Sequence, residues 1–148
     1  QVEIVSNSKH VVCPHCEAVN RIPENRLDQQ PKCGKCKERL FVGQPVELSD
    51  NTFEKHLRRD EIPLVVDFWA PWCGPCKMMG PHFKTVTAQM EPRIRFAKLN
   101  TEHAQRTAAQ YGIRSIPTVA IFRNGREIAR QAGAMDARAL SNWIQSQV

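Results

Sequence analysis

Six cysteines in three C-x-x-C units constrain this 148-residue chain more than any other feature of its sequence. In chain order the units are Cys13/Cys16, Cys33/Cys36 and Cys73/Cys76. Two cysteines at this spacing can hold a metal ion or close a disulfide, so each unit has a metal-binding or a redox role. The residues around each unit distinguish between these two roles.

The first two units match the pattern of a structural zinc site. Sixteen residues separate Cys16 from Cys33, inside the range of roughly 15 to 20 that such sites use. A two-residue gap lets both sulfurs of a tight turn reach one ion at about 2.3 Å, and a second turn completes the tetrahedron. We expect Gly34 to provide a positive φ in the second turn. The pattern predicts one structural Zn²⁺, with no open position for catalysis, bound by Cys13, Cys16, Cys33 and Cys36.

Two other interpretations of this segment remain. The four cysteines could form two disulfides in an oxidising compartment, or His15 could replace one sulfur, although we do not count His15 as a ligand. Between the two turns the chain is polar, and its large apolar residues are only Val19, Ile22 and Leu27. About forty residues with so small a core need a metal or disulfides to fold.

The third unit follows an apolar run at 64–68 that predicts a buried strand. The residues after it, 77–90, carry apolar side chains at mostly helical spacing. Cys73 is therefore expected where a strand ends and a helix begins, a position at which free N–H groups and the helix dipole stabilise a thiolate. Cys76, one turn later, is close enough to form a disulfide with Cys73. Pro75 suits the first helical turn because its missing N–H would have no partner there.

The stretch 69–77, Trp-Ala-Pro-Trp-Cys-Gly-Pro-Cys-Lys, resembles the active site of the thioredoxin family. The resemblance covers about 45–148, and with the preceding cysteine units the whole chain is similar to bacterial members that carry an N-terminal zinc finger. It implies a zinc-finger domain at 1–44 and a thioredoxin domain at 45–148. We expect the segment 42–47 to be a short linker that packs the finger against the second domain, near the substrate surface.

The order of elements supports this fold. A short helix around Phe53 and Leu57 is followed by strands at 63–69, 94–99, 117–123 and 126–131, and by helices at 75–90, 102–110 and 136–146. Pro81 should kink the long helix. The β-α-β-α-β-β-α order predicts an α/β protein with a central mixed β-sheet flanked by helices on both faces, which is the thioredoxin fold.

Asp67 interrupts the most apolar strand, where an unpaired ionised carboxylate is costly. Burial would raise its pKa; the other interpretation is an open strand end at which Asp67 is solvated. The resemblance implies that Cys73 is the nucleophile, that Cys76 resolves the mixed disulfide, and that Asp67 assists proton transfer at Cys76. Lys98 matches a family lysine near this aspartate, although an exposed strand lysine would look the same.

The resemblance also implies a substrate-binding surface around the third unit. It makes the Ile116–Pro117 bond cis and places it beside the active-site cysteines, where the Ile116 backbone can bind an extended substrate strand. The other members of this surface are Trp72, Gly74, Pro75 and Gly133.

The function that the resemblance implies is protein-disulfide reduction by a thiol–disulfide oxidoreductase. Gly74 and Pro75 between the cysteines resemble the reducing members of the superfamily. The implied partners are disulfide-containing proteins and an NADPH-dependent thioredoxin reductase, and we expect a cytoplasmic monomer with no organic cofactor. Four zinc thiolates also favour a reducing compartment. The alternative function is a redox sensor or binding module, in which oxidation of the zinc cysteines releases the metal.

The net charge of +6 at pH 7 invites a nucleic-acid interpretation, which the placement of the charges weakens. Basic residues never occur more than two in a row, and 1–44 contains no aromatic residue before Phe41. Nucleic-acid-binding modules depend on basic stripes and aromatic side chains. The longest apolar run, 64–70, is too short to cross a bilayer. We therefore expect neither a nucleic-acid nor a membrane partner.

Overall fold

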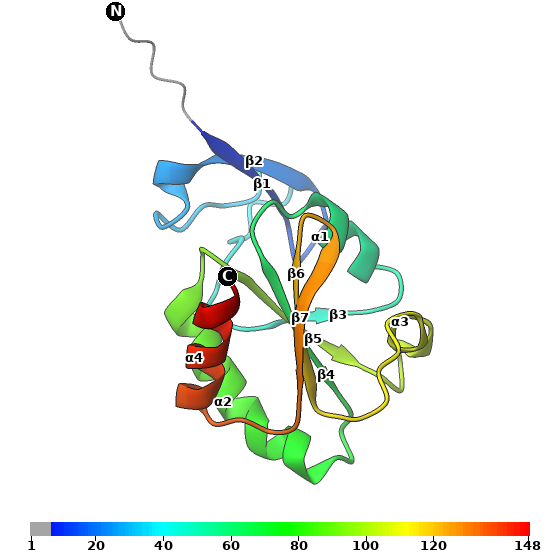
Figure 1. Cartoon of the computed structure of the whole chain (residues 1–148). Coiled ribbons are helices and arrows are strands. Elements are labelled where there is room, and N and C mark those ends of the chain that lie inside the picture. Colours follow the sequence, from blue (N-terminus) through cyan, green and yellow to red (C-terminus); the bar gives the residue numbers. More distant parts are fainter. Residues whose placement is uncertain (1–6) are drawn as a thin grey trace, which may run out of the picture.

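Two sheets contain all the strands that the computed structural model describes, which covers residues 7–148. The elements, in chain order, are β1 (Ser8–Val12), β2 (Val19–Pro23), the 3-10 helix η1 (Glu24–Arg26), β3 (Val46–Leu48), α1 (Phe53–Arg59), β4 (Leu64–Trp69), α2 (Gly74–Met90), β5 (Arg95–Asn100), α3 (Gln105–Gln110), β6 (Thr118–Arg123), β7 (Arg126–Ala132) and α4 (Ala137–Gln147). The first two strands form an antiparallel pair, and the other five form one mixed sheet (Figure 1).

The central strand of the mixed sheet is β4, which explains its nearly uninterrupted apolar sequence. The strand order is β3-β5-β4-β6-β7, so β4 lies between a parallel neighbour, β5, and an antiparallel neighbour, β6. Every residue of β4 except Trp69 is buried. A strand that is covered on both faces needs apolar side chains on both.

Helices α1 and α3 lie on one face of this sheet, and α2 and α4 lie on the other (Figure 1). Two apolar cores fill the spaces between sheet and helices. In one, Phe53 and Leu57 of α1 pack on the sheet; in the other, Phe83 of α2 and Ile144 of α4 pack on the opposite face. The predicted α/β fold, with a central mixed sheet and helices on both faces, is confirmed.

Two local features, the segment 42–47 and the helix around Pro81, were the subject of specific expectations. The expected linker at 42–47 ends in β3, whose Val46 and Leu48 are buried beside β5. Strand β3 has three residues, of which Glu47 is exposed, and it is too short for an alternating apolar pattern to be recognised in the sequence. Helix α2 continues through Pro81, and the hydroxyl of Thr85 donates a hydrogen bond to the Pro81 carbonyl; the kink at Pro81 stays a prediction.

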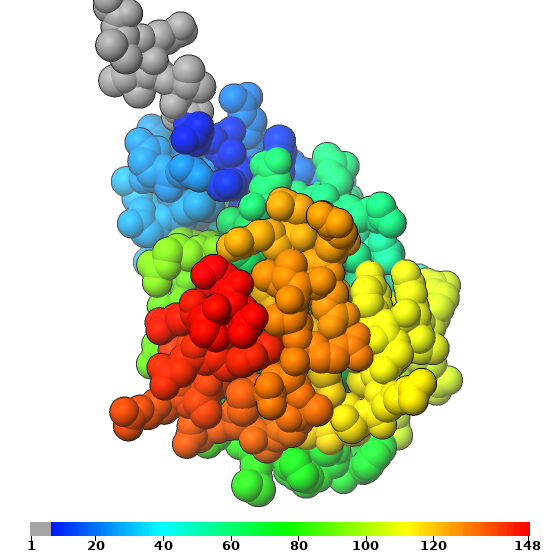
Figure 2. Space-filling view, viewed as in Figure 1, coloured from blue at the N-terminus to red at the C-terminus, as the bar shows by residue number. Residues whose placement is uncertain are grey.

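The segment with the first two cysteine units packs at the end of the mixed sheet that is remote from the start of α2 (Figure 1), and it forms the blue region at the top of Figure 2. Strand β4 starts beside Arg95 of β5, which contacts the carbonyl oxygen of Val12, and ends at Trp69, shortly before Cys73. Five residue steps along a strand, at about 3.3 Å each, separate these two ends by roughly 17 Å. The expected packing is confirmed, but the expected position near the substrate surface is wrong. Polar partners at the start of β5, which the sequence pattern does not reveal, hold the segment there.

Candidate active site and metal centre

Cys73 occupies the position at which β4 has ended and α2 begins. It is the N-cap residue of α2, and its Sγ accepts a hydrogen bond from the N–H of Cys76 at 3.3 Å. The two cysteines are joined as a disulfide. Both are largely buried, with 5% of Cys73 and 2% of Cys76 exposed. Pro75 lies in the first helical turn, as predicted, where its missing N–H costs no helical hydrogen bond.

A strip of backbone lies next to Cys73. The Ile116–Pro117 peptide bond is cis, as expected, and the Sγ of Cys73 is 3.8 Å from the Ile116 carbonyl oxygen. Gly133 adopts a φ of +98°, and its N–H donates to the carbonyl oxygen of Pro117 at 2.9 Å. Ile116, Pro117 and Gly133, which are far from Cys73 in sequence, are therefore brought together next to it.

Trp72 covers the outer side of the same turn. Its side chain is 66% exposed, and its indole Nε1–H donates to a carboxylate oxygen of Glu102 at 2.6 Å. Sequence reasoning missed Glu102, because nothing in the local pattern at 102 points to a partner 30 residues away. Gly74 has no atom within 4 Å of where a Cβ would lie, so that part of the turn faces open space.

Asp67 is fully buried in β4, which rejects the solvated interpretation. Within residues 7–148, neither of its carboxylate oxygens has a hydrogen-bond partner. Burial raises the pKa of Asp67 to about 7, although the positive charge of Lys98 partly opposes the rise and Glu47 adds to it. The expected upward shift is therefore confirmed.

Lys98 lies directly opposite Asp67 on the neighbouring strand β5. Its side chain is half-buried, and its Nζ lies 4.0 Å from the ring centroid of Trp69. An aromatic face attracts a cation in this position. Lys98 is thus held over the sheet near Asp67 and is not a freely exposed strand lysine.

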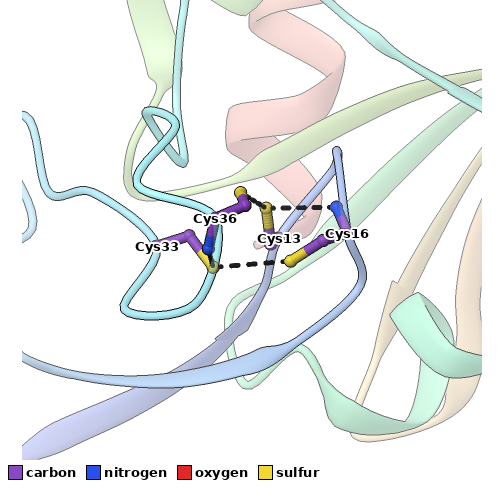
Figure 3. A group of neighbouring side chains, drawn as sticks. All are labelled: Cys13, Cys16, Cys33 and Cys36. Carbon is purple, nitrogen blue, oxygen red and sulfur yellow. Dashed lines mark hydrogen bonds between the residues drawn. The ribbon is translucent and has the colours of Figure 1, made fainter.

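The four remaining cysteines form one cluster. Figure 3 shows their side chains pointing toward one another from two facing turns. All four sulfurs lie within 4.8 Å of one another, and the Cys13–Cys36 and Cys16–Cys33 pairs are 3.6 Å apart. A tetrahedron of sulfurs at about 2.3 Å from a zinc ion has edges of roughly 3.8 Å. The cluster therefore fits a tetrahedral Zn²⁺, with one thiolate contributed by each of Cys13, Cys16, Cys33 and Cys36.

The two turns repeat the same hydrogen bonds. In the first, the N–H groups of His15 and Cys16 point at the sulfur of Cys13, at 3.3 and 3.5 Å. In the second, the N–H groups of Lys35 and Cys36 point at the sulfur of Cys33, at 3.4 and 3.5 Å.

The positive φ of each turn falls on the residue after its second cysteine. Glu17 has a φ of 64° and Lys37 a φ of 69°. The expectation that Gly34 provides it is wrong: Gly34 has no positive φ, and its N–H instead donates to the side chain of Asn20 at 2.8 Å. The chain reverses only after both sulfurs are in place, one residue beyond each unit.

The electrostatics of the cluster call for a cation. Hydrogen bonds, first that from the N–H of Cys36, lower the pKa of Cys33 to about 6 and so favour its thiolate. For Cys36, the N–H of Glu38 acts in the same direction, but burial and the neighbouring sulfurs outweigh it and raise the pKa to about 12. Four sulfurs this close together, two of them buried, cannot all be negative at neutral pH without an opposing charge, which a divalent metal ion would supply.

Comparisons with known proteins agree with both halves of this description. The family described as "Thioredoxin" matches residues 44–146, and the family described as "Thioredoxin 2, N-terminal" matches residues 12–38. Thioredoxin C-3 of Corynebacterium nephridii is 41% identical over 138 residues, which are 93% of this chain and 94% of that protein. A Synechocystis thioredoxin is 41% identical over 99 residues (67% of this chain, 92% of that protein). A thioredoxin of Haemophilus influenzae is 36% identical over 107 residues (72% and 100%).

The fold, the Cys73/Cys76 pair and these matches define a thiol–disulfide oxidoreductase with a redox-active centre. The chain belongs to the thioredoxin family, and its N-terminal segment is of the zinc-ribbon type that the thioredoxin 2 match describes. Among the described residues, no helix has the length and apolar character needed to cross a membrane.

Proposed function

We propose that the protein reduces disulfide bonds of other proteins and is reduced again by an NADPH-dependent thioredoxin reductase. The thiolate of Cys73 attacks one sulfur of the substrate disulfide, forms a mixed disulfide and releases the other substrate sulfur as a thiolate. The thiolate of Cys76 then attacks the sulfur of Cys73. The second substrate sulfur leaves, so two electrons have passed to the substrate and the 73–76 disulfide remains.

The observation that carries this proposal is the position of Cys73 at the N-terminus of α2, beside the Ile116 carbonyl oxygen. The N–H groups of the first helical turn favour a negative sulfur there. The backbone of Ile116, next to the cis Pro117, offers hydrogen bonds to an extended substrate segment. In this proposal Trp72, Gly74, Pro75 and Gly133 surround the substrate, and a small or apolar rim suits a surface that accepts many protein chains.

Asp67 is proposed to act as the proton acceptor for Cys76. A carboxyl group with a pKa raised to about 7 by burial is poised to exchange protons at neutral pH. It lies on β4, the strand that leads into the start of α2, and has no competing hydrogen-bond partner in the described residues. Its part is to take the thiol proton so that Cys76 can resolve the mixed disulfide.

We assign the division at 44/45 as the boundary between a zinc domain and a thioredoxin domain. Cys13, Cys16, Cys33 and Cys36 would hold one structural Zn²⁺, whose chemistry is to neutralise and cross-link four thiolates. Zinc thiolates and a dithiol nucleophile both need a reducing compartment, so the proposal includes a cytoplasmic location. A monomer with no organic cofactor is sufficient for the exchange reaction.

The test is NADPH-coupled reduction of insulin with a bacterial thioredoxin reductase, together with measurement of zinc content. Cys73→Ser should abolish turnover and keep the zinc, because Cys73 is remote from the cluster. Cys33→Ser should lose the zinc and keep turnover within a few-fold, since it leaves Cys73 intact. No turnover by the zinc-loaded wild-type protein would contradict the reductase function, and unchanged zinc in Cys33→Ser would contradict the metal assignment.

A second function, redox sensing by the zinc cluster, is favoured by one observation. Cys16 and Cys36 are only half-buried, so an oxidant can reach the cluster from solvent. Mild peroxide should then release the metal reversibly and change activity or partner choice. Zinc that stays bound while the 73–76 pair oxidises would contradict this function.

A further inference from the structure

The main chain of Val12, next to the first zinc-binding cysteine, is held by two charged side chains from the thioredoxin domain. The N–H of Val12 donates to a carboxylate oxygen of Asp60 at 2.8 Å, and its carbonyl oxygen accepts from the guanidinium of Arg95 at 3.2 Å. Val12 is fully buried, and Asp60 and Arg95 expose only 5% and 1% of their surfaces. Both main-chain groups before Cys13 are therefore fixed by residues from outside the zinc domain.

The same guanidinium reaches the other side of the cluster. Arg95 also donates to the carbonyl oxygen of Leu40 at 2.9 Å, four residues after Cys36. It lies over the ring of Phe41, with the guanidinium carbon 4.3 Å from the ring centroid. One side chain thus contacts the chain before the first cysteine turn and after the second.

The residues around Arg95 hold it and Asp60 in place. The second carboxylate oxygen of Asp60 is 3.0 Å from Nδ1 of the buried His56. Glu91 lies 3.8 Å from the guanidinium and accepts a hydrogen bond from the N–H of Gly43 at 2.9 Å. A planar guanidinium fixed in this way is suited to binding two carbonyl oxygens at once, which a lysine cannot reproduce.

The contacts of Asp60 and Arg95 with the main chain of Val12 and Leu40, called the seam below, differ from the apolar cores of the molecule. They are hydrogen bonds between buried charged side chains and main-chain atoms that lie within four residues of a zinc ligand. In metal sites, groups that orient the ligands from outside the coordination sphere affect metal affinity strongly. In a domain junction without a metal site, such contacts would affect only how tightly the two domains dock.

We propose that Arg95 and Asp60 are positioning residues of the metal centre, supplied by the thioredoxin domain. They fix the backbone on which the cysteine turns are built, so retention of zinc depends on docking of the two domains. By linkage, bound zinc stabilises the docked arrangement by the same factor. This inference rests on the proposed zinc function of the four cysteines.

The test is the rate of zinc transfer from the full-length, zinc-loaded protein to a chromogenic chelator. Arg95→Met keeps most of the side-chain volume and removes every donor, and we expect it to release zinc about 10- to 100-fold faster. Arg95→Lys, which keeps the charge, should fall between Met and wild type. Arg93→Met removes an exposed arginine two residues away and should release zinc at the wild-type rate.

A control for general destabilisation uses Leu140→Ala, which opens a cavity under α4, away from the seam. If Leu140→Ala speeds release as much as Arg95→Met, or if Arg95→Met releases zinc at the wild-type rate, the inference is overturned. Should Arg95→Met fail to fold, Asp60→Asn is measured in its place and must also accelerate release. Wild-type protein that binds no zinc would refute the proposed zinc function instead, which is a different outcome. Insulin reduction by Arg95→Met should stay unchanged, since Cys73 lies at the other end of β4.

Discussion

The catalytic unit and the two metal-binding units share one spacing, but their sulfurs receive different hydrogen bonds. In each metal-binding unit, the first sulfur faces N–H groups from the residues two and three positions later. In the catalytic unit, among the described residues, only the N–H of Cys76 points at the sulfur of Cys73, because the residue two positions after Cys73 is Pro75, which has no N–H. A permanently bound thiolate benefits from both donors, whereas a nucleophile loses reactivity as its negative charge is stabilised.

The chain after each unit also differs. Glu17 and Lys37 take left-handed backbone angles, which reverse the chain and bring the two turns face to face. After Cys76 the chain continues as α2, so the sulfurs stay at the N-terminus of a long helix. The spacing thus fixes only that two sulfurs are neighbours. The residue inside the unit and the one after it decide between a metal site and a redox site.

The two ends of the molecule also treat buried carboxylates differently, and this difference predicts the largest effect. Asp60 at the zinc end has a partner for each oxygen, whereas Asp67 at the catalytic end has none in the described residues. The pKa of Asp67 is raised from 3.8 to about 7, so the protonated form favours folding. This contribution is fully present below 3.8 and is lost as the pH rises through about 7.

The shift corresponds to roughly 4 kcal/mol between the two ends of that pH range. Asp67→Asn should therefore be more stable than wild type above the raised pKa, by up to about 4 kcal/mol, and should match it in acid. Urea unfolding on either side of neutral pH measures this difference. Asp28→Asn, the same change at an exposed aspartate outside the mixed sheet, serves as the matched control. A difference that does not grow with pH would contradict the assignment of an uncharged, buried Asp67.

Replacement of Pro75 should make the catalytic unit resemble the metal-binding ones. Pro75→Ala restores an N–H two residues after Cys73, and one hydrogen bond to a sulfur is worth about 1 kcal/mol. The extra donor stabilises the reduced, thiolate form, so the reduction potential should rise by roughly 20 mV. Equilibration with glutathione buffers measures the potential. Pro81→Ala, a proline substitution on the same helix but remote from the sulfurs, should leave it unchanged; equal shifts in both variants would refute the explanation.

Sequence patterns predicted the parts of this molecule that depend on neighbours along the chain. The apolar run around Asp67 indicated a buried strand in which burial would raise the pKa of the carboxyl, and the context of Cys73 indicated a helix N-terminus. The contacts of the seam could not be predicted from neighbours along the chain. Arg95 begins a strand, where a charged residue is ordinarily exposed, and its partners are main-chain carbonyl oxygens 55 and 83 residues away. Main-chain partners leave no side-chain pattern in the sequence.

The smallest effect concerns the turn geometry of the metal-binding units, where the sequence favoured the wrong residue. Gly34 has no positive φ, and a Cβ there would meet only the Asn20 side chain at 3.7 Å, an ordinary contact. Gly34→Ala should therefore change zinc affinity and stability by less than about 0.5 kcal/mol. Lys37 has a φ of 69° and donates from Nζ to the carbonyl oxygen of Gly34 at 2.8 Å. Lys37→Gly relieves backbone strain of about 1–2 kcal/mol but loses chain entropy on folding, so a net gain of about 0.5 kcal/mol is expected.

Competition with a zinc chelator and thermal unfolding of the zinc-loaded protein measure both substitutions. Lys77→Gly, at the matching position of the catalytic unit, is the informative control because Lys77 lies in α2 and not in a left-handed turn. Glycine inside a helix costs about 1 kcal/mol relative to alanine, so Lys77→Gly should destabilise the protein where Lys37→Gly stabilises it. Opposite signs at equivalent positions would establish that the residue after the second cysteine separates the two kinds of site; equal signs would contradict that distinction.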